Sequence, residues 1–189
     1  LSTYFYSNTG EYDEKLLKKI DQFPTRKYFT DFKYDKKIVG DTCKYWIKAQ
    51  EKINIDRKLK FFKTHNAFGA LNNNHFTDSK NSVAVIYVIR DPRNIITSLK
   101  NHYSLQEEGA LEMINSIYRN LRDENDHDNY SSYSFISSWA NNYNSWKMSK
   151  NINKLIVKYE DLENHANETF LKIVNFTDNL LKKNNNLNQ

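Results

Sequence analysis

The sequence predicts an α/β protein in which a central parallel sheet is flanked by helices. Three short apolar segments carry this prediction, and they begin at Lys60, Val83 and Lys154. Each is rich in Phe, Val, Ile or Leu, which is typical of strands that helices cover on both faces. Each also ends in polar residues. Because ligands bind at the carboxyl ends of parallel strands, those polar residues are the candidates for function.

Helical or loop patterns fill the chain between the strands. The asparagine cluster 72–74 and Gly69 predict a loop over residues 66–80. A polar stretch over 121–132 predicts a mobile surface segment, and the last residues, 179–189, predict a disordered polar tail after one domain over 1–178. Helices are predicted over residues 1–7, 13–20, 41–52, 92–103, 107–118, 135–148 and 164–176, with an aromatic loop over 28–34.

The segment from Val83 is the most informative of the three. It ends in Arg90 and is followed at once by Asp91 and Pro92. Proline suits the first position of a helix and aspartate suits the capping position before it, so a helix is predicted to start here without a loop. Ser98 comes eight residues after Arg90, on that helix. Arg90 and Ser98 could therefore converge on one anionic group.

The segment from Lys60 ends in Lys63, Thr64 and His65. Side chains alternate along an extended chain, which places Lys63 and His65 on one side and Thr64 on the other. This strand end is therefore predicted to present a cation together with a titratable base. The segment from Lys154 ends in Tyr159, followed by two acidic residues that are predicted to cap the next helix.

Taken together, the three strand ends resemble the sulfotransferase family, whose members use 3′-phosphoadenosine 5′-phosphosulfate (PAPS) as the sulfuryl donor. The resemblance runs from the first residues to about Phe176. It implies a three-layer, P-loop-like fold and transfer of a sulfuryl group to a hydroxyl or amine of a small-molecule, lipid or glycan acceptor. It implies no metal ion.

The resemblance also assigns roles to the residues at the strand ends. His65 is implied as the general base and Lys63 as the cation that stabilises the oxygen bridging sulfur and phosphorus. Arg90 and Ser98 are implied to hold the 3′-phosphate of the donor, and Tyr159 to contact the adenine. The residue types fit these roles, because imidazole titrates near neutral pH and guanidinium offers a planar pair of donors to phosphate.

The sequence also departs from the family pattern. Family members open with a strand and a loop of the Lys-Ser-Gly type that surrounds the 5′-phosphosulfate, and here residues 1–7 instead look like the helix that would follow that loop, with Gly10 as its stop signal. Nor does the polar end of the chain contain the basic, glycine-containing segment that closes over the nucleotide. The expectation is a domain cut at both ends, with weak or no activity.

Each candidate residue also has a purely structural interpretation. His65 could cap a strand end, and Lys63 could extend its ammonium into solvent. Arg90 could form an ion pair with Asp91 or Glu160. Tyr159 could be an ordinary core aromatic. Arg93 is a weaker candidate for phosphate binding, and the histidines outside the strand end, at positions 75, 102, 127 and 165, are predicted to lie at the surface.

Composition narrows the class of protein. A chain of 189 residues, 39% of them hydrophobic, can bury one core, and no apolar run approaches the ~18 residues of a membrane span. Cys43 is the single cysteine, which favours the cytoplasm and a packed thiol. The net charge of +5 favours anionic partners, but the lysines are dispersed, so nucleic acid is not expected.

Two other functions remain open from the sequence. The first is a nucleotide-binding or kinase-type domain of related P-loop architecture, which the absence of a glycine-rich phosphate loop disfavours. The second is a binding protein that keeps the fold without the chemistry. Preference for a nucleotide bearing a 3′-phosphate separates the first from a sulfotransferase, and binding without turnover identifies the second.

Overall fold

A computed structural model of the protein describes residues 1–7, 9, 11–122 and 131–186. The chain divides into two compact units. The first comprises Leu1–Thr77 with Asn120–Ile136, and the second comprises Asp78–Arg119 with Ser137–Gln189. Gly10, predicted as a helix stop, and most of the polar segment predicted over 121–132 lie outside the described residues.

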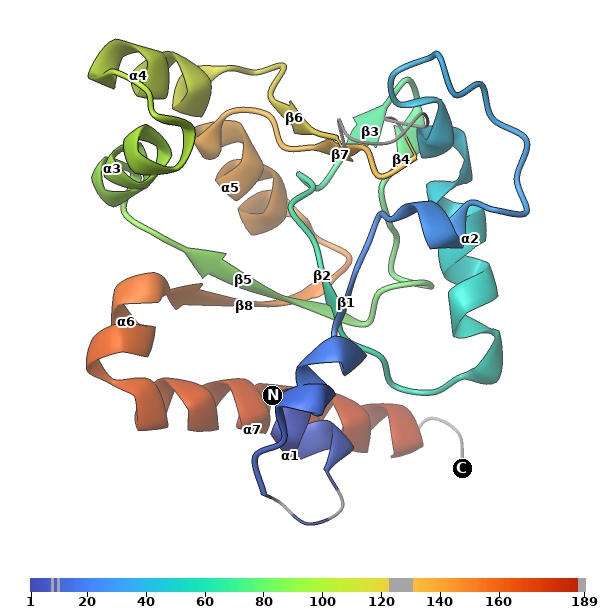
Figure 1. The fold of residues 1–189 in the computed structure, drawn as a ribbon. Helices are drawn as coiled ribbons and strands as arrows, with labels where there is room; N and C mark the ends of the chain where they lie inside the picture. The colour runs from blue at the N-terminus through green and yellow to red at the C-terminus, as the bar shows by residue number, and fades with distance from the viewer. Residues whose placement is uncertain (8, 10, 123–130, 187–189) are drawn as a thin grey trace. The chain divides into compact units, whose positions relative to one another are not determined.

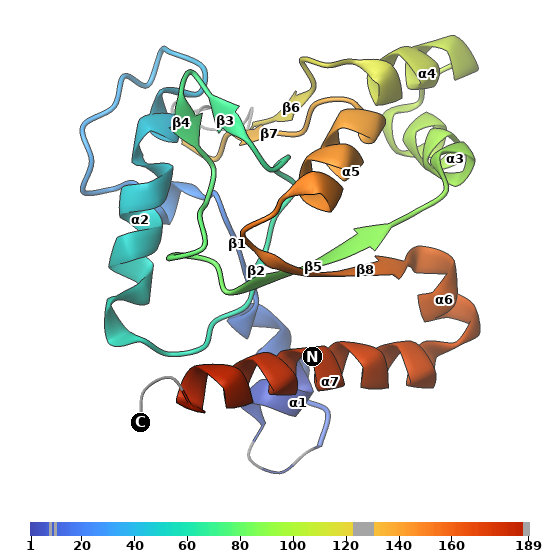
Figure 2. The same ribbon diagram turned by 180° about the vertical axis from the view of Figure 1, so that it is seen from behind.

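Two parallel strands form the centre of the second unit. β5 (Ala84–Ile89) pairs with β8 (Asn153–Lys158), in a register that runs from Ala84 opposite Asn153 to Ile89 opposite Lys158. The helix α5 (Trp139–Met148) lies on one face of this pair and α7 (Ala166–Asn186) lies on the other, as both views show (Figure 1; Figure 2). The other helices are α3 (Pro92–Tyr103), α4 (Glu107–Asn115) and α6 (Tyr159–Asn164).

Side chains point alternately to the two faces of the strands and contact the helices on each face. Tyr87 points toward α5, where its hydroxyl donates a hydrogen bond to Asn142 Oδ1 over 2.9 Å. Val157, on the opposite face, is buried. Beside this sheet, Leu99 of α3 packs with Ala110 and Ile114 of α4. A helix therefore packs against each face of the strand pair, which fixes where its carboxyl ends emerge.

The first unit contains shorter elements. Its parallel pair consists of β1 (Asp21–Gln22) and β2 (Phe62–Lys63), with Gln22 opposite Lys63. Two antiparallel pairs join β3 (Ala70–Leu71) to β4 (Asn74–His75) and β6 (Asn120–Leu121) to β7 (Ser134–Phe135). The helices are α1 (Ser2–Tyr6), α2 (Trp46–Ile53) and the 3₁₀ turns η1 (Glu14–Lys19), η2 (Arg26–Tyr28), η3 (Asp41–Tyr45) and η4 (Asn54–Asp56).

An aromatic cluster forms the core of the first unit. The ring of Phe23 lies 5.9 Å from those of Phe29 and Phe76, and Trp46 meets Phe76 edge to face at 5.3 Å. Cys43 is buried beside them, and burial raises the pKa of its thiol to about 12. The thiol therefore stays protonated at neutral pH, which agrees with its prediction as a packing residue.

The mixed α/β class is confirmed, but the strands differ from the prediction. The strand predicted over 60–65 is only two residues long and pairs with β1, rather than extending the ladder of β5 and β8. β5 was expected to be buried on both faces, yet Val88 is 47% exposed. The apolar pattern thus located the strands, but it could not determine their partners, which depend on residues distant in sequence.

Several helices begin later or extend farther than predicted. The helix predicted over 13–20 is the 3₁₀ turn η1, and the one predicted over 135–148 begins at Trp139, because Ser138 caps it. The loop predicted over 66–80 contains the β3–β4 hairpin. The chain expected to be a disordered tail is helical as far as Asn186. None of the helices in the described part of the chain has the length and apolar character needed to cross a membrane.

Candidate functional site

The turn between β5 and α3 has the predicted structure. Asp91 caps α3, its carboxylate accepting a hydrogen bond from the backbone N–H of Arg93 over 2.8 Å, and Pro92 occupies the first turn. The side chain of Arg93 returns to the same carboxylate in an ion pair of 2.6 Å and is 87% exposed. That bond lowers the pKa of Asp91 to about 2. Arg93 therefore serves the cap, and Arg90 is left as the cation of this turn.

Arg90 lies against Tyr159. The guanidinium carbon of Arg90 stands 4.5 Å from the centre of the Tyr159 ring, which is cation–π geometry. The strand register explains this contact. The last paired residues are Ile89 and Lys158, and because side chains alternate, the next residue of each chain projects on the same side.

The guanidinium of Arg90 is only partly satisfied. Its Nε is buried and has no hydrogen-bond partner among the described residues. The predicted alternative, an ion pair of Arg90 with Asp91 or Glu160, does not occur in this part of the chain, because Asp91 pairs with Arg93. A buried donor without an acceptor costs free energy unless a ligand satisfies it, and phosphate oxygens suit guanidinium donors.

Glu160 has a different role from the one the sequence predicts. It was expected to cap the next helix, but it lies within α6, and its carboxylate accepts a hydrogen bond from the backbone N–H of Asp91 over 3.2 Å. The backbone N–H groups of Glu160 and Asp91, together with the nearby side chain of Asn94, hold the pKa of Glu160 below its usual value. The acid thus joins the end of β8 to the start of α3.

Ser98 lies two turns into α3. It follows Asn94 by four residues, which places the two on the same face of the helix, and the side chain of Asn94 lies near Glu160. The Ser98 hydroxyl is exposed and makes no hydrogen bond within the part of the chain that the structure describes. Ser98 is therefore available to a ligand on the face of α3 that meets the end of β8.

The second group of candidates, Lys63 and His65, belongs to the first unit. Lys63 ends β2, and its backbone carbonyl accepts a hydrogen bond from the N–H of Phe23 over 2.9 Å. Its side chain is exposed and makes no ion pair within residues 1–7, 9, 11–122 and 131–186. The ammonium is thus unneutralised and faces solvent, which suits a role toward an anionic ligand.

His65 lies two residues beyond β2, in a turn rather than in the predicted strand. The hydroxyl of Thr64 accepts a hydrogen bond from the backbone N–H of Asn66 over 3.1 Å, and Ala67 donates its N–H to the carbonyl of Phe135 over 2.8 Å. Asn66 and Ala67 are buried, whereas His65 is exposed. The backbone on both sides of His65 is therefore fixed while its imidazole remains accessible.

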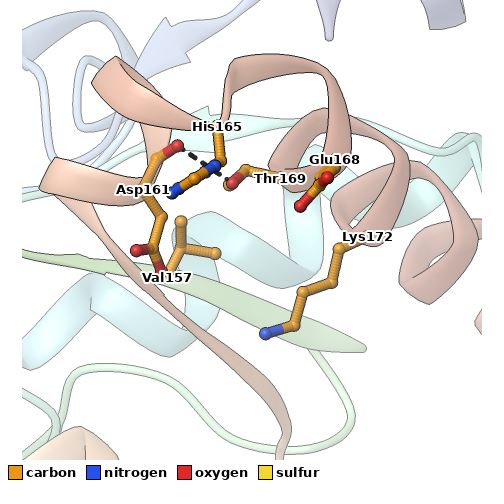
Figure 3. A pocket seen from close by; sticks show the side chains of 6 residues that line it. All are labelled: Val157, Asp161, His165, Glu168, Thr169 and Lys172. Carbon is orange, nitrogen blue, oxygen red and sulfur yellow. Dashed lines mark hydrogen bonds between the residues drawn. The ribbon is translucent and has the colours of Figure 1, made fainter.

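The other histidines do not share this setting. His75 is exposed on β4, His102 meets the ring of Tyr103, and His127 lies outside the described residues. His165 lines a pocket of about 270 Å³ between β8, α6 and α7, together with Val157, Asp161, Glu168, Thr169 and Lys172 (Figure 3). Among the described residues, no group of three or more His, Cys, Asp or Glu side chains is placed to hold a metal ion.

Comparison with protein families gives a match. The family described as the sulfotransferase domain matches residues 13–188, which is most of the chain and extends beyond the boundary predicted near residue 178. Comparison with curated proteins finds no match. The family match includes both strand-end groups described above.

Proposed function

Because the chain belongs to the sulfotransferase family and is therefore a transferase, we propose that it transfers a sulfuryl group from PAPS to a hydroxyl or amine of a small-molecule, lipid or glycan acceptor. The buried, unpartnered Nε of Arg90 carries the proposal. Together, the end of β5, helix α3 and the start of α6 offer this nitrogen, an exposed serine hydroxyl and an aromatic ring to one anionic, ring-containing ligand. The 3′-phosphate and adenine of the donor have that chemistry.

Three residues of the second unit bind the donor in this proposal. Arg90 supplies charge-assisted hydrogen bonds to the 3′-phosphate, and Ser98 adds its hydroxyl. Tyr159 contacts the adenine with the ring face or hydroxyl that Arg90 leaves open. Asp91 does not compete for Arg90, since Arg93 already neutralises it. Binding at this site is therefore expected to depend on the phosphate at the 3′ position.

Two residues of the first unit act on the reacting groups. The bound donor supplies a sulfuryl group attached to a phosphate leaving group. His65 takes the proton from the acceptor hydroxyl as the oxygen attacks, and Lys63 stabilises the negative charge that develops on the oxygen bridging sulfur and phosphorus. The exposed imidazole and the unneutralised ammonium support these roles. No metal ion is part of the mechanism.

Calorimetric titration tests the donor site without requiring turnover. The chain is titrated with 3′-phosphoadenosine 5′-phosphate (PAP) and, for comparison, with adenosine 5′-phosphate (AMP). PAP is expected to bind at least tenfold more tightly, and the Arg90→Ala, Ser98→Ala double variant is expected to lose this preference. Equal affinity for the two nucleotides in the unchanged, folded chain contradicts the proposal and favours a nucleotide-binding domain of another kind.

A further inference from the structure

We propose that Glu160 is a positioning residue of the anion site, because its carboxylate completes the cap of α3 from the end of β8 and so fixes Arg90 relative to Ser98. This inference rests on the proposed function, since it concerns the same 3′-phosphate site. It is independent of the roles assigned to Lys63 and His65.

The hydrogen bonds at the start of α3 resemble a capping box whose acid comes from another segment. In a capping box, the third residue of the helix is Glu or Gln, and its side chain accepts a hydrogen bond from the N–H of the capping residue. In α3 the cap is Asp91 and the third residue is Asn94. Glu160, 69 residues away, accepts the Asp91 N–H instead, and the side chain of Asn94 lies near the Glu160 carboxylate.

This arrangement continues the strand register after the backbone ladder ends. Beyond Ile89 and Lys158 the two segments of the chain lead into helices α3 and α6, so their backbones no longer pair. Side chains replace that pairing, because Arg90 contacts Tyr159 and the next residue, Asp91, contacts Glu160. Two consecutive contacts therefore hold the two strand ends together.

The position of Glu160 explains why it acts through other residues. Its carboxylate is anionic and therefore repels a phosphate, so it cannot itself be a phosphate ligand. It accepts the hydrogen bond of the peptide N–H that follows Arg90, and it lies near Asn94, which shares a face of α3 with Ser98. Glu160 thereby restrains the backbone from which the Arg90 side chain extends, and it restrains the helix that carries the Ser98 hydroxyl. Preorganisation of this kind raises affinity by reducing the cost of ordering on binding.

The sharpest test compares Glu160→Met with Glu160→Gln. The two side chains are similar in size and uncharged, but only glutamine keeps an oxygen that can accept the Asp91 N–H. We expect the Kd for PAP to rise about tenfold in the Met variant and to stay within about threefold of the unchanged chain in the Gln variant. AMP affinity is expected to change less than twofold in both. Glu163→Ala, an exposed change on the same helix, is the matched control and should alter neither affinity.

Amide hydrogen exchange tests the contact itself without nucleotide. The Asp91 amide is expected to exchange faster in the Met variant and at the original rate in the Gln variant. Should the Met variant not fold, Glu160→Asp replaces it, because the shorter side chain withdraws the carboxylate from the amide while keeping its charge. The same tenfold loss of PAP affinity is expected.

The outcomes distinguish this inference from the proposed function. If the unchanged chain binds PAP and AMP equally, the proposed function is wrong and this inference fails with it. If the unchanged chain prefers PAP and the Met or Asp variant keeps that preference in full, the donor site stands and the role of Glu160 is wrong. If Met and Gln weaken PAP binding equally, the acceptor oxygen is not what matters, and the inference is again wrong.

Discussion

The two strand ends that carry the candidate residues are held in different ways. β5 and β8 pair over six residues each, and a helix begins at or soon after the end of each strand. Residues at the two ends also contact one another through their side chains. At the end of β2, two residues are paired, and the Thr64 hydroxyl together with backbone hydrogen bonds fixes the chain on either side of His65. The donor-binding candidates therefore lie on a longer paired ladder, whereas the catalytic candidates are exposed at the end of a two-residue pair.

The largest effect on the rate of sulfuryl transfer is expected at the end of β2, where only two residues are paired. His65→Ala removes the proposed base, and general-base catalysis is worth roughly 10²- to 10⁴-fold, so sulfuryl transfer should fall by that factor. PAP affinity should change little, because the proposed contacts of PAP are those of Arg90, Ser98 and Tyr159. A single-turnover assay with protein in excess measures this even where rates are low. The matched change His75→Ala should leave the rate as it was; a His65 variant that retains full transfer contradicts the base assignment.

Lys63 should show the next largest effect. Lys63→Met keeps much of the side-chain length but removes the charge, and loss of one stabilising donor to a developing charge costs roughly 10²- to 10³-fold in rate. Lys58, which is exposed on the approach to β2, supplies the control Lys58→Met. Comparable losses in both variants would mean that general surface charge, rather than the position of Lys63, matters.

A substitution of Arg90 tests the other strand end, where β5 and β8 finish. Arg90→Ala should weaken PAP binding by roughly 10- to 100-fold, the usual worth of hydrogen bonds to a charged group, with little effect on AMP. Arg93→Ala should change PAP affinity less than threefold, because Arg93 is 87% exposed and paired with Asp91. Calorimetry distinguishes the two variants. A larger loss with Arg93 would transfer the phosphate-binding role to that residue.

The smallest expected effect is on the thermal stability of the fold at acid pH. The pKa of Asp91 is lowered to about 2, first by the side-chain hydrogen bond from Arg93, and that of Glu160 is also lowered. A carboxylate whose pKa is lower in the folded chain than in the unfolded chain stabilises the fold at every pH above its unfolded pKa, which is near 4. That stabilisation is lost as the pH falls toward the pKa of the folded chain. The melting temperature should therefore show no titration of these groups between pH 7 and 5 and should fall below about pH 4.

The partial solvent exposure of these two carboxylates keeps the acid effect small. Solvent and salt screen such charges, so the melting temperature of Asp91→Asn should differ from that of the unchanged chain by only a few degrees at pH 7. The difference should vanish near pH 2. An Asp91→Asn curve parallel to that of the unchanged chain from pH 7 to 2 would show that the ion pair with Arg93 contributes nothing.

Local signals were sufficient to predict the β5–α3 turn. Asp91 and Pro92 determine where the helix starts through contacts within a few residues, and the structure confirms both. The β3–β4 hairpin was missed although its signal is also local. Asn72 and Asn73 both have positive φ, as a two-residue hairpin turn requires, and asparagine tolerates that conformation better than most residues. The asparagine cluster indicated a turn but was interpreted as a loop.

The contacts of Tyr159 and Glu160 could not be predicted in this way. They depend on the register of β5 against β8, and these strands are separated by more than 60 residues of sequence. The sequence placed Arg90, Tyr159 and Glu160 at strand ends, but the pairing of Arg90 with the tyrosine rather than with an acid follows only from that register. Likewise, nothing local indicated that β2 would pair with β1 and end before His65.

One measurement tests the location of the donor site most directly, namely the amide hydrogen exchange of the chain with and without PAP. The account predicts slower exchange in peptides covering residues 90–98 and 159–160 with PAP and not with AMP. Peptides of the pocket in Figure 3 that contain only residues 165–172 should not change. PAP-dependent protection confined to that pocket, or the same protection with AMP, would contradict a 3′-phosphate site at Arg90.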